Sequence, residues 1–226
     1  MSAPKINYIK SIRLEDHLAR KLIVVLIAPI LGIAVLLAFL LDLKTAAAIF
    51  DENGPVEMPS AGLWVIAAMI VMFWQKHSAA KAFLFAACFV LFASREIGLH
   101  KAFTDQSILK TNYYETLEGA GHILTGLLAL CFILVIAGSF IYSIHYCIRQ
   151  SQCKYFSCKL LLASWVLLIA SKILDRFPAK LREIFDITLS PRQDVVLLSL
   201  EETLEVIVPA MMIMVFLSAR NPVRHT

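Results

Sequence analysis

Six runs of apolar residues, each close to the length that crosses a bilayer, limit how this chain can fold. A membrane-spanning helix needs about 20 consecutive apolar residues, because each residue advances the helix by about 1.5 Å. The runs cover 22–42, 61–76, 82–101, 119–145, 160–177 and 197–218. The composition agrees, since 59% of the 226 residues are hydrophobic, more than in an ordinary soluble domain. We therefore expect an all-α, polytopic integral membrane helical bundle with six transmembrane helices.

The connections between the runs are short and none has low complexity, which indicates a single transmembrane domain over 1–226. Two segments lie outside the runs. Residues 1–21 form a basic leader, which we expect in the cytoplasm. In 178–190, apolar residues recur at helical spacing between charged ones until Ser190-Pro191 ends the pattern. This pattern predicts a separate helix that lies along the outer membrane surface.

The basic residues predict the orientation of the chain. The leader places Lys5, Lys10, Arg13, Arg20 and Lys21 next to the first run. The loops after the second and fourth runs and the C-terminal tail are also basic. Positive charge near membrane spans favours the cytoplasmic side, and an even number of spans returns the chain to that side. Both termini are therefore expected in the cytoplasm, in a multi-pass protein of the bacterial inner (plasma) membrane.

Ionisable residues gather at one end of each of the last four runs, and the predicted topology brings these four ends to the outer side. The groups are Arg95, Glu96 and His100; Glu115, Glu118 and His122; Lys172, Asp175 and Arg176; and Glu201, Glu202 and Glu205. Charged side chains near hydrocarbon cost a few kcal/mol each and usually face the protein interior or a water-filled cavity. The grouping predicts a polar pocket that opens outward between the last four helices.

The spacing within two of these groups is compatible with a metal site. Glu96 and His100 are four residues apart, as are Glu118 and His122, so each pair shares one helical face. Carboxylate oxygen and imidazole nitrogen together suit a divalent metal such as zinc, manganese or iron. The sequence thus offers these four residues as candidate ligands of a divalent metal.

As an enzyme, the protein would act by hydrolysis or group transfer on a lipid or lipid-linked substrate at the outer face. The candidate catalytic residues are Glu118, His122, Glu201 and Glu205, which would move protons or bind the metal. The candidate substrate-binding residues are Arg95, Lys172 and Arg176, whose positive charges would hold an anionic headgroup.

Other functions are compatible with the same residues, and the sequence leaves open whether the protein is an enzyme. It can be a transporter or a proton- or ion-coupled carrier, in which the acids relay an ion. It can also be a non-catalytic assembly partner in an envelope membrane complex, with the charges forming structural ion pairs. A transporter usually carries polar residues at the membrane midplane. Here the inner halves of the predicted helices are almost wholly apolar, which favours a site open on one side. The bilayer is the expected partner, and nothing in the sequence indicates nucleic-acid binding.

Overall fold

The chain is helical throughout the part that the structure describes. A computed structural model describes residues 25, 27–51, 54–73, 78–99, 120–149 and 156–218, with the backbone alone at 120–122 and 156. A first helix covers Ile27–Leu40. It is followed by α2 (Leu43–Phe50), α3 (Glu57–Phe73), α4 (Ala79–Glu96), α7 (Ala120–Arg149), α8 (Phe156–Phe185) and α9 (Pro191–Ser218). These residues contain seven helices and no strand, which confirms the all-α class.

Each predicted apolar run coincides with one helix, and the short α2 is additional. Within the described ranges, two helices are long and apolar enough to cross a membrane by length and composition. They are Ile123–Arg149 in α7 and Ser157–Phe185 in α8. The helices Ile27–Leu40 and Glu57–Phe73 are apolar but shorter.

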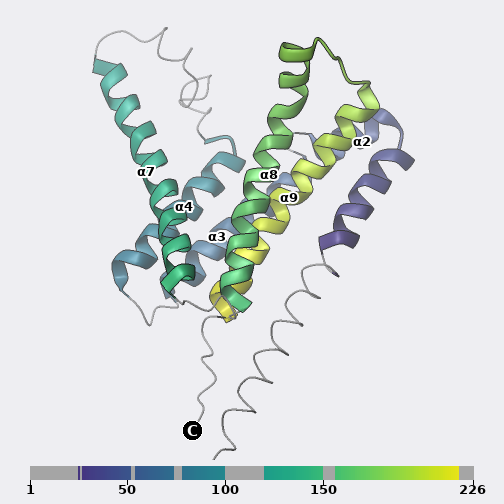
Figure 1. The fold of residues 1–226 in the computed structure, drawn as a ribbon. Coiled ribbons are helices and arrows are strands. Elements are labelled where there is room, and N and C mark those ends of the chain that lie inside the picture. Colours follow the sequence, from purple (N-terminus) through teal and green to yellow (C-terminus); the bar gives the residue numbers. More distant parts are fainter. Residues whose placement is uncertain are drawn as a thin grey trace, which may run out of the picture.

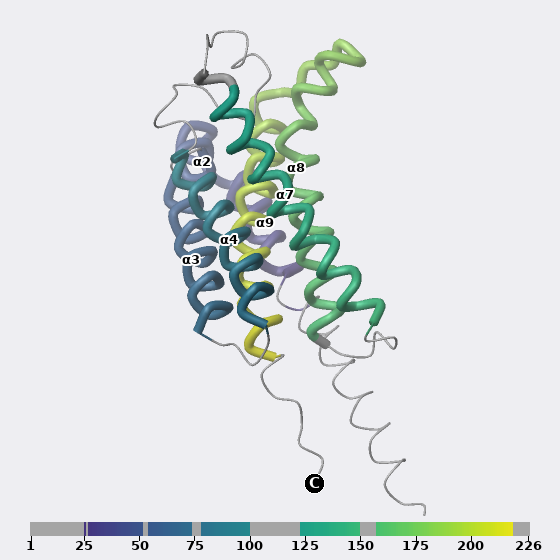
Figure 2. Tube along the Cα trace, turned by 90° about the vertical axis from the view of Figure 1, so that its left-hand side faces the viewer, coloured from purple at the N-terminus to yellow at the C-terminus, as the bar shows by residue number. Residues whose placement is uncertain are grey.

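Five helices form a ring. Along it α3 contacts α4, α4 contacts α7, α7 contacts α8, α8 contacts α9, and α9 returns to α3. Figure 1 shows α7 and α8 as two long helices, and Figure 2 shows the helices as one bundle. The C-terminal ends of α4 and α8 lie at the upper end in Figure 1, with the N-terminal ends of α7 and α9. We call this the outer end of the bundle and the opposite one the inner end. The described members of the predicted polar groups thus lie toward one end.

Aromatic side chains fill the interior of the five-helix bundle toward its inner end. The ring of Phe216 on α9 lies 5.4 Å from that of Phe85 and 5.8 Å from that of Phe89, both on α4, measured between ring centroids. Tyr142 on α7 meets Phe85 edge-on at 5.8 Å. Each pair of this kind adds about 0.5–1.5 kcal/mol beyond the burial of its area. These contacts close the inner half of the bundle largely through aromatic packing, and the Lys81 ammonium of α4 lies over the Tyr142 ring, 5.1 Å from its centroid.

The predicted separate helix over 178–190 is wrong, because α8 runs through Pro178 and ends at Phe185. Asp186 adopts a left-handed conformation with φ 54°, and the Ile187 N–H donates to the Leu181 carbonyl at 3.3 Å. A left-handed residue of this kind commonly ends a helix. The break expected at Pro178 therefore occurs eight residues later.

A capping box starts α9 at Pro191, earlier than the predicted run. The Ser190 hydroxyl accepts from the Gln193 N–H at 3.4 Å, and the Gln193 side chain accepts from the Ser190 N–H at 2.9 Å. Proline is favoured at the first helical position, which follows this serine. Arg192 then donates to the carbonyls of Ala38 and Leu41 at the end of the first helix. These bonds place the first helix beside the outer half of α9.

A hydrogen bond between two buried side chains joins α7 to α8 in the inner half, and its removal should weaken the contact between these helices. Trp165 donates from Nε1 to the Ser143 hydroxyl at 3.0 Å, and both side chains are buried. We expect Trp165→Phe to cost about 0.5–1.5 kcal/mol, the usual net contribution of one intramolecular hydrogen bond. Thermal unfolding in detergent measures the loss. In the double variant with Ser143→Ala, the loss of stability should be smaller than the sum of the two single losses. A loss equal to that sum would contradict a direct bond.

Candidate functional site

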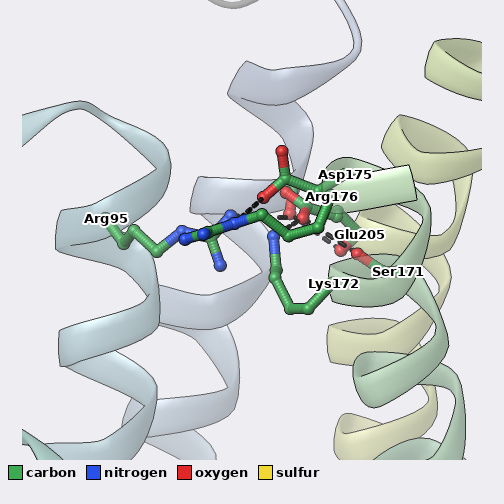
Figure 3. A network of polar contacts seen from close by, with 7 residues as sticks. Arg95, Ser171, Lys172, Asp175, Arg176 and Glu205 are labelled. Atoms are coloured by element: carbon green, nitrogen blue, oxygen red, sulfur yellow. Dashed lines mark hydrogen bonds and ion pairs between the residues drawn. The ribbon is translucent and has the colours of Figure 1, made fainter. Parts of the chain in front are cut away.

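Glu205 of α9 is the centre of a polar network between three helices. Its Oε1 accepts from the Ser171 hydroxyl at 2.9 Å, from the Lys172 ammonium, and from Arg95 Nη2 at 3.3 Å. Ser171 and Lys172 lie on α8, whereas Arg95 lies on α4. Figure 3 shows Arg95 reaching from α4 toward α8 and α9, where the other side chains meet. One carboxylate oxygen therefore joins two cations and a hydroxyl.

The helix boundaries explain why this network is buried. Because α9 begins at Pro191, Glu205 lies 14 residues into the helix, about 21 Å from its start. The backbone carbonyl of Glu205 also accepts from the Ser60 hydroxyl of α3 at 2.8 Å. Ser60 lies in the first turn of α3 and is fully buried. The network thus joins the outer ends of α3 and α4 to the middle of α8 and α9.

A second buried carboxyl faces Glu205. Glu96, the last residue of α4, is 6% exposed and Glu205 is 5% exposed. The two carboxyl groups contact each other closely enough for a hydrogen bond between them. Such a bond requires one proton on the pair, because two carboxylates in contact repel each other. The pair can therefore hold a proton and carry a single negative charge.

The two cations of the network are only partly covered. The side chain of Arg95 is 28% exposed and that of Lys172 is 30% exposed, whereas that of Glu205 is 6% exposed. The carboxylate is thus enclosed while both cations keep access to the surface. The guanidinium has five N–H groups and the ammonium has three, so donors are left for a bound anion.

Glu202 is buried without a partner, one turn closer to the outer end than Glu205. It is 6% exposed, and within the described residues it forms no hydrogen bond and no ion pair. Its charged neighbours are Glu205, Glu201, Glu57 and Lys172. Three of these four are carboxylates, which an unpaired carboxylate would repel. A buried carboxyl in such surroundings is suited to exchanging a proton.

A cleft between α8 and the first turns of α9 adjoins the network. Its volume is about 300 Å³. The polar residues that line it are Asp175, Arg182, Asp194 and Glu201, and Leu174, Pro178, Val195, Leu197 and Leu198 supply the apolar wall. Glu201 therefore reaches the surface through this cleft, whereas Glu202 and Glu205 face other helices.

The predicted binding residues divide into two sets. Arg95 and Lys172 meet at Glu205, as expected for one pocket. Arg176 instead pairs with Asp175 at 3.9 Å, with exposed side-chain fractions of 77% and 45%. This pair lies on the surface, where an ion pair contributes about 0–1 kcal/mol. Arg176 is thus next to the network without being held by it.

The predicted metal site falls largely outside the described residues. His100 and Glu118 lie there entirely, as does the side chain of His122, and Glu96 is the one candidate ligand of the four whose side chain is described. Over the ranges with described side chains, no group of three or more His, Cys, Asp or Glu residues is placed to hold a metal ion. The metal site therefore stays a prediction from the sequence.

Sequence reasoning missed two residues of the site and one distinction among its acids. Ser60 and Ser171 complete the donors around Glu205, but a serine in an apolar run has no distinguishing pattern. The sequence groups Glu201, Glu202 and Glu205 together, whereas the structure pairs only Glu205. The i,i+4 relation of Glu201 and Glu205 does not reveal which carboxyl faces Lys172.

Comparisons of the chain with protein-family models, with curated proteins and with solved structures find no match.

Replacing the central carboxylate should destabilise the bundle, because it strands two cations. We expect Glu205→Gln to cost about 3–5 kcal/mol, the range for removing one partner of a buried ion pair. Thermal unfolding in detergent measures this cost. Asp175→Asn is the matched control, since it neutralises an exposed acid nearby and should cost about 0–1 kcal/mol. Equal, small losses for both variants would show that Glu205 does not hold the helices together.

Proposed function

We propose that this protein is a six-span membrane protein whose Glu205 network binds an anionic headgroup and performs acid–base chemistry on it. In this proposal each helix except the short α2 crosses the membrane, with both termini in the cytoplasm. The outer end of the bundle then lies at the outer face of the bacterial inner membrane. The substrate is a lipid or a lipid-linked compound, and the reaction is hydrolysis or group transfer.

Apolar side chains on the outside of the bundle support six spans. Large apolar residues are well exposed on helices that are too short or too charged to count as spans by composition alone. Examples are Leu40 at 72% on the first helix, Phe73 at 86% on α3 and Phe83 at 67% on α4. A water-soluble protein rarely exposes so many large apolar side chains, whereas lipid is a suitable solvent for them.

The observation that carries the proposed binding function is the convergence of Arg95 and Lys172 on one enclosed carboxylate. If Glu96 and Glu205 share one proton, the pair carries one negative charge against two positive charges. The network then keeps a net positive charge, and that charge lies on the two exposed side chains. A phosphate or carboxylate headgroup would find two cations already held in place, so less side-chain entropy is lost on binding.

The acids divide the remaining work. Glu205 accepts three hydrogen bonds on one oxygen, which suits it to anchoring the cations rather than to receiving a proton. Glu202 is unpaired and Glu201 reaches the outer cleft, so these two are the better candidates for general acid–base catalysis. Glu118 and His122 remain candidates from the sequence.

The aromatic filling of the inner half favours this proposal over a carrier. Phe85, Phe89 and Phe216 occupy the ring below the network, where a carrier needs a polar route. A site that opens to one side of the membrane suits an enzyme better than a transporter.

The proposed topology is tested by labelling one position at each end of the bundle. In a cysteine-free background, Ile187→Cys lies between α8 and α9 at the outer end, and Ser218→Cys ends α9 at the inner end. We expect a membrane-impermeant maleimide to label the first variant in intact cells and the second only after permeabilisation. Labelling in the opposite order would reverse the orientation.

The proposed chemistry predicts that binding and turnover depend on different residues. Lys172→Gln should weaken binding of phosphatidylglycerol about tenfold in detergent solution, as measured by native mass spectrometry. Glu202→Gln should leave this binding and the unfolding temperature unchanged, but abolish turnover of radiolabelled membrane lipids separated by thin-layer chromatography. The control is Arg176→Gln, which removes one positive charge from the exposed pair with Asp175 instead of from the network. Unchanged lipid binding in Lys172→Gln would contradict the headgroup site.

A further inference from the structure

A second cleft lies at the outer end of the bundle, between the first helix, α8 and the start of α9. Its volume is about 530 Å³, and ligand pockets usually have about 300–1,000 Å³. Figure 1 shows α8 and α9 joined at this end, with the purple first helix beside α9. The apolar wall includes Phe39 of the first helix, Phe177 of α8 and Val196 of α9. Arg192 and Gln193, in the first turn of α9, supply polar groups.

Arg192 brings to this cleft a positive charge that no described carboxylate neutralises. Its Nη1 donates to the carbonyls of Ala38 and Leu41 at 2.7 and 2.8 Å, and it forms no ion pair within the described residues. Asp42 follows Leu41 but caps α2 with its side chain, and Asp194 lines the other cleft. A guanidinium has five N–H donors, of which Nη1 holds two. The donors of Nη2 and Nε are therefore left for a bound anion.

The positive charge and the apolar wall follow one another from the outer rim inward. Because α9 runs from the outer to the inner end, Val196 lies four residues inward of Arg192, or about 6 Å. The first helix runs in the opposite direction, so Phe39 lies inward of Leu41, whose carbonyl binds Arg192. Phe39 is 59% exposed and Phe177 is 42% exposed, so the wall is open to a ligand. This is the order of a lipid's headgroup and acyl chain in the membrane.

We propose that this cleft binds a phospholipid of the outer leaflet, with its phosphate at Arg192 and an acyl chain along Phe39 and Val196. Arginine binds phosphate through paired N–H···O bonds, and burial of the apolar wall against the chain adds affinity. The inference goes beyond the proposed function and takes from it only the membrane spans and their orientation. Arg192 and Glu205 are 13 residues apart on α9, about 20 Å along the axis, so one phosphate does not reach both.

Two substitutions test the two parts of this site, and each has a matched control. Arg192→Gln removes the charge, whereas Lys180→Gln removes a charge at the same end from an exposed ion pair outside the cleft. Phe39→Ala removes part of the wall, whereas Phe83→Ala makes the same change on α4, where the side chain is 67% exposed. Binding of phosphatidylglycerol to each full-length variant is measured by native mass spectrometry. Thermal unfolding shows that the variants are folded.

All four variants are made in the Lys172→Gln background, so that lipid at the Glu205 network contributes little. We expect Arg192→Gln and Phe39→Ala to bind phosphatidylglycerol about tenfold more weakly than this background, and both controls to bind it equally well. Excess inorganic phosphate should not displace the lipid.

Unchanged binding in Phe39→Ala or in a folded Arg192→Gln would overturn the inference, as would an equal loss in the controls. Displacement by inorganic phosphate would overturn it in favour of a soluble anion. If Lys172→Gln alone leaves lipid binding unchanged, the headgroup site of the proposed function fails. The comparisons at Arg192 and Phe39 then still decide whether the cleft binds lipid.

Discussion

The enclosed carboxylate of Glu205 is the constraint around which the outer half of this bundle is arranged. An isolated charge in such surroundings costs several kcal/mol, so it persists only where partners surround it. Ser171 and Lys172 supply partners from α8, and Arg95 supplies one from α4. Ser60 holds the backbone of the same residue from α3. The relative positions of α3, α4, α8 and α9 are thus linked through one residue of α9.

The bundle uses different interactions at its two ends, and this difference has a functional consequence. Toward the inner end, aromatic packing and the bond from Trp165 to Ser143 hold α7 against α4 and α8. Toward the outer end, the network joins α3, α4, α8 and α9, and it does not include a described residue of α7. The two partly exposed cations thus belong to the outer network, away from the aromatic packing of the inner half.

Much of the architecture could be predicted from the sequence. Apolar runs fix where helices form, since only a helix satisfies its own backbone in a long apolar segment. The charges of α4, α8 and α9 could also be expected to meet, because charged side chains on apolar helices usually face partners or water. The prediction failed where local signals compete. Pro178 was expected to break a helix that instead continues to Phe185, because a proline inside a helix removes one backbone hydrogen bond and can bend the helix without ending it.

The sequence by itself determined the helical class, the positions of the long helices and the set of ionisable residues from which a site can form. Only the tertiary structure decided how these residues divide their roles. Glu202 and Glu205 are three residues apart on one helix, yet the first is buried without a partner and the second accepts three hydrogen bonds. Asp175 and Lys172 are likewise three residues apart, and one lies in an exposed pair while the other enters the network. The physical reason is that helical spacing fixes which side chains share a face, whereas the rotation of each helix against its neighbours decides which of them meet an opposite charge.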